Sequence, residues 1–208
     1  QDISEHVGVP AHLAVADRIA ASSITLLKND RNLLPLLGTR SARVMSISYR
    51  RGSDVLAGRF FNRTLRQTYP RLAVAELDAA SDDFAYAEVL RRARDQALVI
   101  VGTYVTAVSY GGGVAIPEEL IEFIEQLRRI GVPHVVVSFG NPYLISEFPD
   151  VQAYMLAWNG SEASQRAAGR ALLGVSEITG HMPTRVPPFF EIGDGLMLPV
   201  KRQAAGGG

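Results

Sequence analysis

A short apolar run in the middle of the chain constrains the fold more than any other feature. Residues 97–101 read Ala-Leu-Val-Ile-Val, which is rich in β-branched residues and too short for a stable helix. A strand that does not alternate polar and apolar residues is covered on both faces, as in the middle of a parallel sheet. The polar, glycine-rich stretch that follows, up to Pro117, therefore leaves the carboxyl end of a central strand, where open α/β sheets bind ligands.

Strand-like and helix-like segments alternate along the rest of the chain. The apolar patterns predict strands at 43–48, 71–77, 97–101, 134–138 and 152–157. Amphipathic patterns with capping signals predict helices at 10–27, 54–67, 82–94, 117–130 and 161–173. This alternation predicts a three-layer α/β sandwich with a doubly wound, mostly parallel, five-stranded sheet in the flavodoxin-like order 2-1-3-4-5.

Composition excludes several classes of function. Lys plus Arg equals Asp plus Glu, so no net field attracts nucleic acid or an anionic membrane. No apolar run approaches the length of a transmembrane helix, and there is no cysteine for a disulfide or a thiolate site. The four histidines fall in four different elements, so we expect neither a metal site nor a cofactor. We expect a soluble chain, and the sequence leaves its compartment open, with the periplasm or secretion as options for the full-length protein.

The residues offer no self-contained catalytic set. Gly111–Gly113 lies too far beyond the strand to be a phosphate-binding turn, and no serine sits in a Gly-x-Ser-x-Gly motif. A glycosidase needs two carboxyl groups at a fixed separation, and sequence alone pairs none here. Five aromatic residues lie at or beyond the predicted strand ends: Tyr49, Tyr104, Tyr110, Tyr143 and Trp158. Their rings could stack on a sugar or pack against a neighbouring domain, and we favour the neighbour.

Five segments together resemble the carboxyl-terminal α/β-sandwich domain of glycoside hydrolase family 3. These segments are 21–36, 139–143, 157–174, 180–183 and 192–196, in the family's order. The resemblance implies a linker at 1–9, the family domain at 10–196, and a disordered tail or artificial remnant at 197–208. Gly180-His181-Met182-Pro183 departs from the family's usual Gly-Arg/Lys-Leu-Pro, which makes any role for a cation at this position doubtful.

The resemblance implies a retaining β-glycosidase that acts on oligosaccharides or glycan fragments. In this family the nucleophilic aspartate lies on an amino-terminal (β/α)₈ barrel, which would be the partner of this chain. The β-glucosidase-like branch takes its acid/base glutamate from the loop before Pro117, but residues 106–116 contain no carboxylate here. A general acid needs an ionisable proton, which serine and tyrosine supply poorly. The loop is more similar to the β-N-acetylhexosaminidase branch, where a barrel histidine–aspartate pair is the acid/base.

This resemblance implies that the chain contributes a wall of a substrate cleft and no catalytic residue, with little activity when isolated. The candidate substrate-cleft or interdomain residues are Tyr104, Ser109, Tyr110, Gly111, Gly112, Asn141, Tyr143, Trp158 and Asn159. Two alternatives stay open: a free-standing flavodoxin-like module that binds a small ligand, and a scaffold that docks a partner chain.

Overall fold

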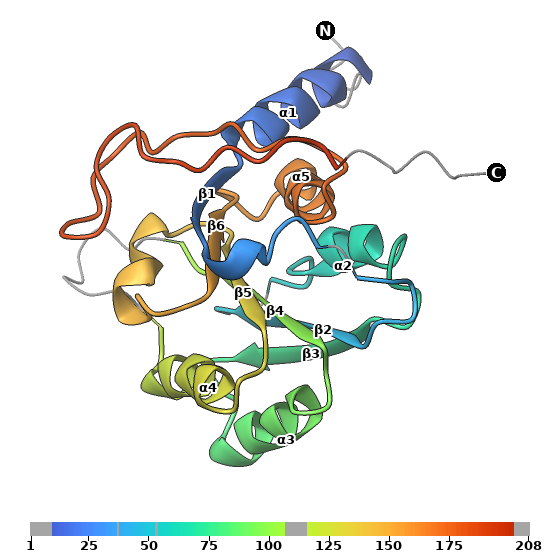
Figure 1. Ribbon diagram of the computed structural model, residues 1–208, viewed down its shortest axis with the longest axis vertical. Helices are drawn as coiled ribbons and strands as arrows, with labels where there is room; N and C mark the ends of the chain where they lie inside the picture. Colours follow the sequence, from blue (N-terminus) through green and yellow to red (C-terminus); the bar gives the residue numbers. More distant parts are fainter. Residues whose placement is uncertain (1–9, 37, 53, 107–115, 202–208) are drawn as a thin grey trace, which may run out of the picture.

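The computed structural model describes residues 10–36, 38–52, 54–106 and 116–201, which form three layers (Figure 1). Their six-stranded sheet has the order β1-β6-β5-β4-β2-β3. The strands are β1 (Thr25–Asn29), β2 (Val44–Arg50), β3 (Ala73–Asp78), β4 (Leu98–Tyr104), β5 (His134–Ser138) and β6 (Ala153–Leu156). The α-helices are α1 (Pro10–Ser23), α2 (Arg59–Leu65), α3 (Asp83–Ala93), α4 (Glu118–Arg129) and α5 (Glu162–Leu172), with 3₁₀ turns η2 (Asp30–Asn32) and η3 (Pro142–Glu147).

The parallel part of the sheet confirms the predicted order. β2 to β6 pair in parallel as β3-β2-β4-β5-β6, which is the order 2-1-3-4-5 when the predicted strands are numbered along the chain. In the central strand, Val101 lies between Ile47 of β2 and Val136 of β5. All residues of β4 are buried, as expected for a strand covered on both faces.

The sheet has one strand more than we predicted. The first helix ends at Ser23, and Thr25–Asn29 forms β1, which pairs antiparallel with β6. Leu26 and Leu27 are both buried, in the cores on opposite faces of the sheet, as alternating side chains of a strand are. The prediction of a helix to Leu27 was wrong. Ile24 and Leu27 fit both a helical stripe and an extended strand, and pairing with the edge of β6 favours the strand.

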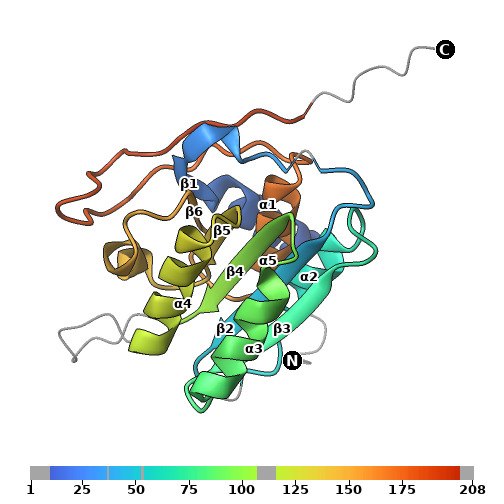
Figure 2. The same ribbon diagram turned by 60° about the horizontal axis from the view of Figure 1, so that its bottom comes forward.

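Helices cover both faces of the sheet. Figure 2 shows α3 and α4 over one face, with α1, α2 and α5 on the other. The core under α3 and α4 includes Ile47, Val101 and Phe123, and the core under α2 and α5 includes Phe61, Ile100 and Phe139. Across the described residues, no helix is long and apolar enough to cross a membrane.

The second helix begins later than predicted. We expected it from Asp54, but α2 starts at Arg59 because Gly58 has φ = +76°, a left-handed conformation. A Cβ on Gly58 would lie only 2.1 Å from the Ser48 hydroxyl oxygen, so the close approach requires glycine. Leu56 lies before the helix and is exposed.

The carboxyl-terminal segment after α5 covers the outer edge of β1. The backbone N–H of Gly180 donates to the Ile24 carbonyl at 3.1 Å, and that of Leu196 donates to the Leu26 carbonyl at 2.7 Å. Figure 1 shows this segment running alongside β1. Leu198 bridges Ile178, and the Lys201 N–H donates to the Gly174 carbonyl. Our prediction of a disordered tail from residue 197 is therefore wrong for residues 197–201, because Leu198 and Lys201 are hydrogen-bonded into the fold.

Candidate functional site

The carboxyl ends of β4, β5 and β6 lie at one edge of the sheet because these strands are parallel. We call this the carboxyl edge: the segments 105–106, 139–143 and 157–161 as far as they are described. Of the predicted site residues, Ser109, Tyr110, Gly111 and Gly112 lie outside the described residues. The structure brings Asn141, Tyr143, Trp158 and Asn159 to this edge on two neighbouring connections.

Tyr104 is a core residue, which corrects its prediction as a cleft residue. Its ring stacks on Phe139 with centroids 4.4 Å apart and planes 4° from parallel, and only 7% of the residue is exposed. The absence of side chains at Gly102 and Gly160 makes room for the ring. Its hydroxyl has no hydrogen-bond partner among the described residues, and burial raises the pKa of Tyr104 above its ordinary value. The last residue of a strand points into either layer, and sequence does not reveal which.

Asn141 shapes the connection after β5 from inside the fold. It is buried, its side-chain Oδ1 accepts the Tyr143 N–H at 2.9 Å, and its carbonyl accepts the Ser138 hydroxyl at 2.7 Å. These bonds start η3 and fix the position of Tyr143, which is 39% exposed. Asn141 is therefore a positioning residue, and Tyr143 offers an aromatic surface at the edge.

Trp158 and Asn159 also use their polar groups within the fold. Trp158 has φ = +64°, and its indole N–H donates to the Ser23 carbonyl at 2.8 Å, which ties the edge to the end of α1. Asn159 is exposed, but its Oδ1 accepts both the Ser161 N–H and the Ser164 hydroxyl at 2.9 Å. Ser161 in turn caps α5. Both residues thus hold the start of α5 and the end of α1 in place.

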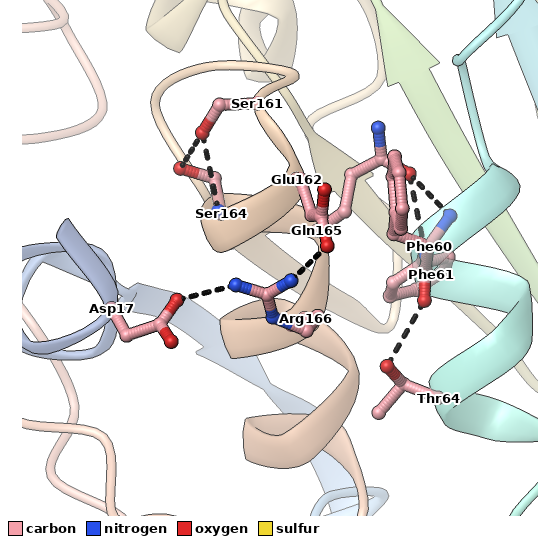
Figure 3. Close-up of polar contacts among 9 residues, drawn as sticks. All are labelled: Asp17, Phe60, Phe61, Thr64, Ser161, Glu162, Ser164, Gln165 and Arg166. Carbon is pink, nitrogen blue, oxygen red and sulfur yellow. Dashed lines mark hydrogen bonds and ion pairs between the residues drawn. The ribbon is translucent and has the colours of Figure 1, made fainter. Parts of the chain in front are cut away.

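Gln165 is an organising residue that the sequence did not reveal. It is fully buried, and its Oε1 accepts the N–H groups of Phe60 and Phe61 at 3.0 and 3.2 Å (Figure 3). Its Nε2 donates to the carbonyls of Leu56 and Gly160 at 3.0 and 2.8 Å. One side chain therefore joins α5 to the start of α2 and to the loop after β6. A glutamine inside a helix gives no sequence signal for this role.

A groove of about 840 Å³ runs between α3 and α4, over the other face of the sheet. Tyr86, Leu90 and Phe123 contribute its apolar lining. Its charged lining residues are Asp83, Arg91, Arg94, Glu118, Glu119 and Glu122. The acidic residues of the first helical turns, Asp83, Glu118 and Glu119, lie toward the carboxyl edge, where they complement the helix dipoles. No sequence pattern that we identified predicts this groove.

The edge, as described, shows no assembled reaction centre. Over the described ranges, no group of three or more His, Asp or Glu side chains could hold a metal ion. The side chains of Asn141, Trp158 and Asn159 form hydrogen bonds within the protein itself, whereas Tyr143 is 39% exposed at the described part of the edge.

A family model described as "Glycosyl hydrolase family 3 C-terminal domain" matches residues 24–199. No curated protein matches the chain significantly.

Solved structures of similar fold include parts of much longer enzymes. A fungal multi-domain GH3 β-N-acetylglucosaminidase is 18% identical with a TM-score of 0.74, covering 89% of this chain and 20% of that one. A β-glucosidase from Listeria innocua in complex with glucose is 17% identical with a TM-score of 0.72, covering 90% and 28%. A GH3 β-N-acetylglucosaminidase from Paenibacillus sp. str. FPU-7 is 17% identical with a TM-score of 0.68, covering 84% and 32%. The chain thus spans at most about a third of these structures, and the likeness establishes the fold.

Proposed function

Because the chain belongs to the family of glycosyl hydrolase family 3 C-terminal domains, we propose that it forms one wall of the active-site cleft of a retaining β-glycosidase. The partner in this proposal is an amino-terminal (β/α)₈ barrel of the same enzyme, which carries the nucleophile and the acid/base. The substrate is an oligosaccharide or a glycan fragment with a terminal β-linked sugar.

One observation supports a wall rather than a reaction centre. Residues 106–116, between β4 and α4, contain no Asp or Glu, so the loop offers no carboxyl group as general acid. Retaining hydrolysis requires two groups about 5–5.5 Å apart on either side of the glycosidic bond. The described part of the edge uses Asn141, Trp158 and Asn159 to hold its own backbone. The reactive groups then belong to the barrel, and Tyr143 and the loop bound the sugar from this side.

The missing loop carboxylate also bears on the substrate. It favours the β-N-acetylhexosaminidase type, in which the barrel supplies the acid/base, over the β-glucosidase type. The fold likeness extends to structures named for both activities and does not choose between them.

The test compares two substrates in the complete enzyme. We expect a higher kcat/KM for an aryl β-N-acetylglucosaminide than for the matching aryl β-glucoside. In Tyr110→Phe, the alkaline limb of the pH–rate profile should keep its apparent pKa, because the general acid that titrates there belongs to the barrel. A fall of kcat by more than about a hundredfold in Tyr110→Phe, with the alkaline limb lost, would place the acid on this chain and overturn the proposal.

A second candidate function is binding of a small ligand by the chain itself. The groove between α3 and α4 favours it, since about 840 Å³ with an apolar lining and charged groups is within the size range of ligand sites. Thermal-shift screening of the isolated chain with sugars and nucleotides tests it. A raised melting temperature that Arg94→Ala, at an exposed lining residue of the groove, abolishes and Ile130→Ala keeps would support this candidate.

A further inference from the structure

The charges of this chain balance overall but are distributed unevenly along it. Residues 40–71 contain eight arginines, no lysine and a single acidic residue, Asp54. The rest of the chain is left with 13 basic and 20 acidic residues, because the whole has 21 of each. A cluster of one sign creates a local electrostatic field that a net charge of zero hides.

The two faces of the sheet differ in charge in the same way. Figure 1 shows α1, α2 and α5 on one side of the sheet and α3 and α4 on the other. The first three helices carry five arginines and two acidic residues. The other two carry four arginines and six acidic residues. The side of the molecule that contains α2 is therefore positive, and the opposite side is negative.

Three arginines form a row along α2. Arg59, Arg63 and Arg66, which is the C-cap residue of the helix, are all exposed. At about 100° per residue they lie within about 60° of one another around the helix axis, and successive members rise about 6 and 4.5 Å along it. Phe61 and Leu65, on the opposite side of the helix, are buried. We call these three arginines the α2 arginine row.

The acidic residues of the neighbouring helices already have partners. Arg166 of α5 donates to Asp17 of α1 at 2.7 Å and also pairs with Glu162 on its own helix (Figure 3). Asp17 and Glu162 are the only acidic residues in the sequences of α1, α2 and α5. Asp54, ahead of α2, accepts the N–H of Leu56. Within the described part of the chain, no member of the α2 arginine row forms an ion pair.

The α2 arginine row starts beside the proposed cleft wall. Gln165 donates to the carbonyls of Leu56 and Gly160, so the start of α2 lies next to the segment 157–161 of the carboxyl edge. From there α2 returns toward the opposite edge of the sheet, because it connects the end of β2 to the start of the parallel strand β3. A polymer whose end lies at the carboxyl edge can therefore continue along the row.

We infer that the α2 arginine row binds an anionic polysaccharide, with the acidic groups of successive sugars on the guanidinium groups. Arginine suits this task because its planar fork of N–H donors matches a carboxylate and keeps its charge at any physiological pH. The choice of a glycan among polyanions rests on the proposed function, to which the row adds a charge class of substrate. Sites for single-stranded nucleic acid also use exposed aromatic rings. In α2, Phe61 is buried and Phe60 is half-buried beside the Arg59 guanidinium.

Fluorescence anisotropy of labelled oligosaccharides tests the inference in the complete enzyme. The probe is an oligogalacturonate, which carries one carboxylate per sugar and has α-linkages that a β-glycosidase leaves intact. A malto-oligosaccharide of equal length is the neutral comparison. We expect only the oligogalacturonate to bind, and more weakly as the salt concentration rises.

A pair of double variants locates the binding surface. Arg63→Gln with Arg66→Gln should raise the Kd of the oligogalacturonate about tenfold. The matched control, Arg128→Gln with Arg129→Gln, removes two exposed arginines from the end of α4 and should keep the Kd within about twofold. Thermal melting of both variants should match the wild type, because all four side chains are exposed.

Different results separate the inference from the proposed function. Equal Kd values in the two double variants, or no preference for the charged oligomer over the neutral one, overturn the inference. Tighter binding of single-stranded DNA or of vesicles with anionic lipid, lost with Arg63 and Arg66, also overturns it, because the partner then belongs to another class. The proposed function is contradicted separately, by a complete enzyme that hydrolyses neither aryl glycoside.

Discussion

Replacing Gln165 by leucine should destabilise the fold more than any surface change of similar size. Leucine has a similar volume but removes four hydrogen bonds, leaving the N–H groups of Phe60 and Phe61 and the carbonyls of Leu56 and Gly160 without this partner. One bond is fully buried and three are partly buried, so some groups can turn to water.

The magnitude follows from the burial of these groups. Each buried polar group left unpaired costs about 1–3 kcal/mol, and the added apolar side chain returns about 1–2 kcal/mol. We expect the free energy of unfolding to fall by about 2–4 kcal/mol, which for a domain of this size lowers the melting temperature by roughly 4–16 °C.

Urea and thermal unfolding followed by circular dichroism measure this effect. Gln126→Leu is the matched control, because Gln126 lies on the surface of α4 and donates to Glu122 in an exposed hydrogen bond. Its effect should stay within about 0.5 kcal/mol. If Gln165→Leu were equally mild, the reasoning that one side chain joins α2, α5 and the loop after β6 would be refuted.

Three further outcomes follow from the structure. His134 is buried with its Nε2 unpaired among the described residues, and burial lowers its pKa, so the free energy of unfolding in urea should decline as the pH falls from about 6.5 toward that lower value. His134→Gln should flatten this decline, and an unchanged slope would contradict the prediction. Thermal melts should show that Tyr104→Phe lowers the free energy of unfolding by less than about 1 kcal/mol, whereas Tyr104→Ala lowers it by about 3–5 kcal/mol, because the ring stacks in the core. Equal effects of the two substitutions would argue against a packing role of the ring. Gly180→Ala should lower the free energy of unfolding in urea by about 1–3 kcal/mol, because its Cβ would clash with the Ile24 carbonyl oxygen. Wild-type stability of this variant would show that the carboxyl-terminal segment beside β1 can move to relieve the clash.

The sequence was sufficient to predict the parallel part of the fold. Unbroken apolar runs such as 97–101 and 134–138 mark buried strands, and short helical patterns between them leave few topologies. β1 was missed because Ile24 and Leu27 satisfy a helical and an extended pattern equally. What decides between them is the edge of β6, whose residues lie 124 or more positions further along the chain than their partners in β1, as in the pair Asn29 and Ala153.

The candidate site was predicted less completely. The order of the strands indicates that Asn141, Tyr143, Trp158 and Asn159 lie at one edge, because loops after neighbouring parallel strands meet there. It could not tell that Tyr104 points into the core, or that Gln165 is buried. Both depend on which side chains lie opposite in space, and no local pattern encodes that.

The most direct test of the account is glycosidase activity with and without the rest of the enzyme. Purified chain should cleave aryl β-N-acetylglucosaminide and aryl β-glucoside no faster than buffer, while the complete enzyme turns over at least one of them. Saturable hydrolysis by the chain alone, lost on substitution of one of its own carboxylates, would contradict the claim that its partner carries the reactive groups.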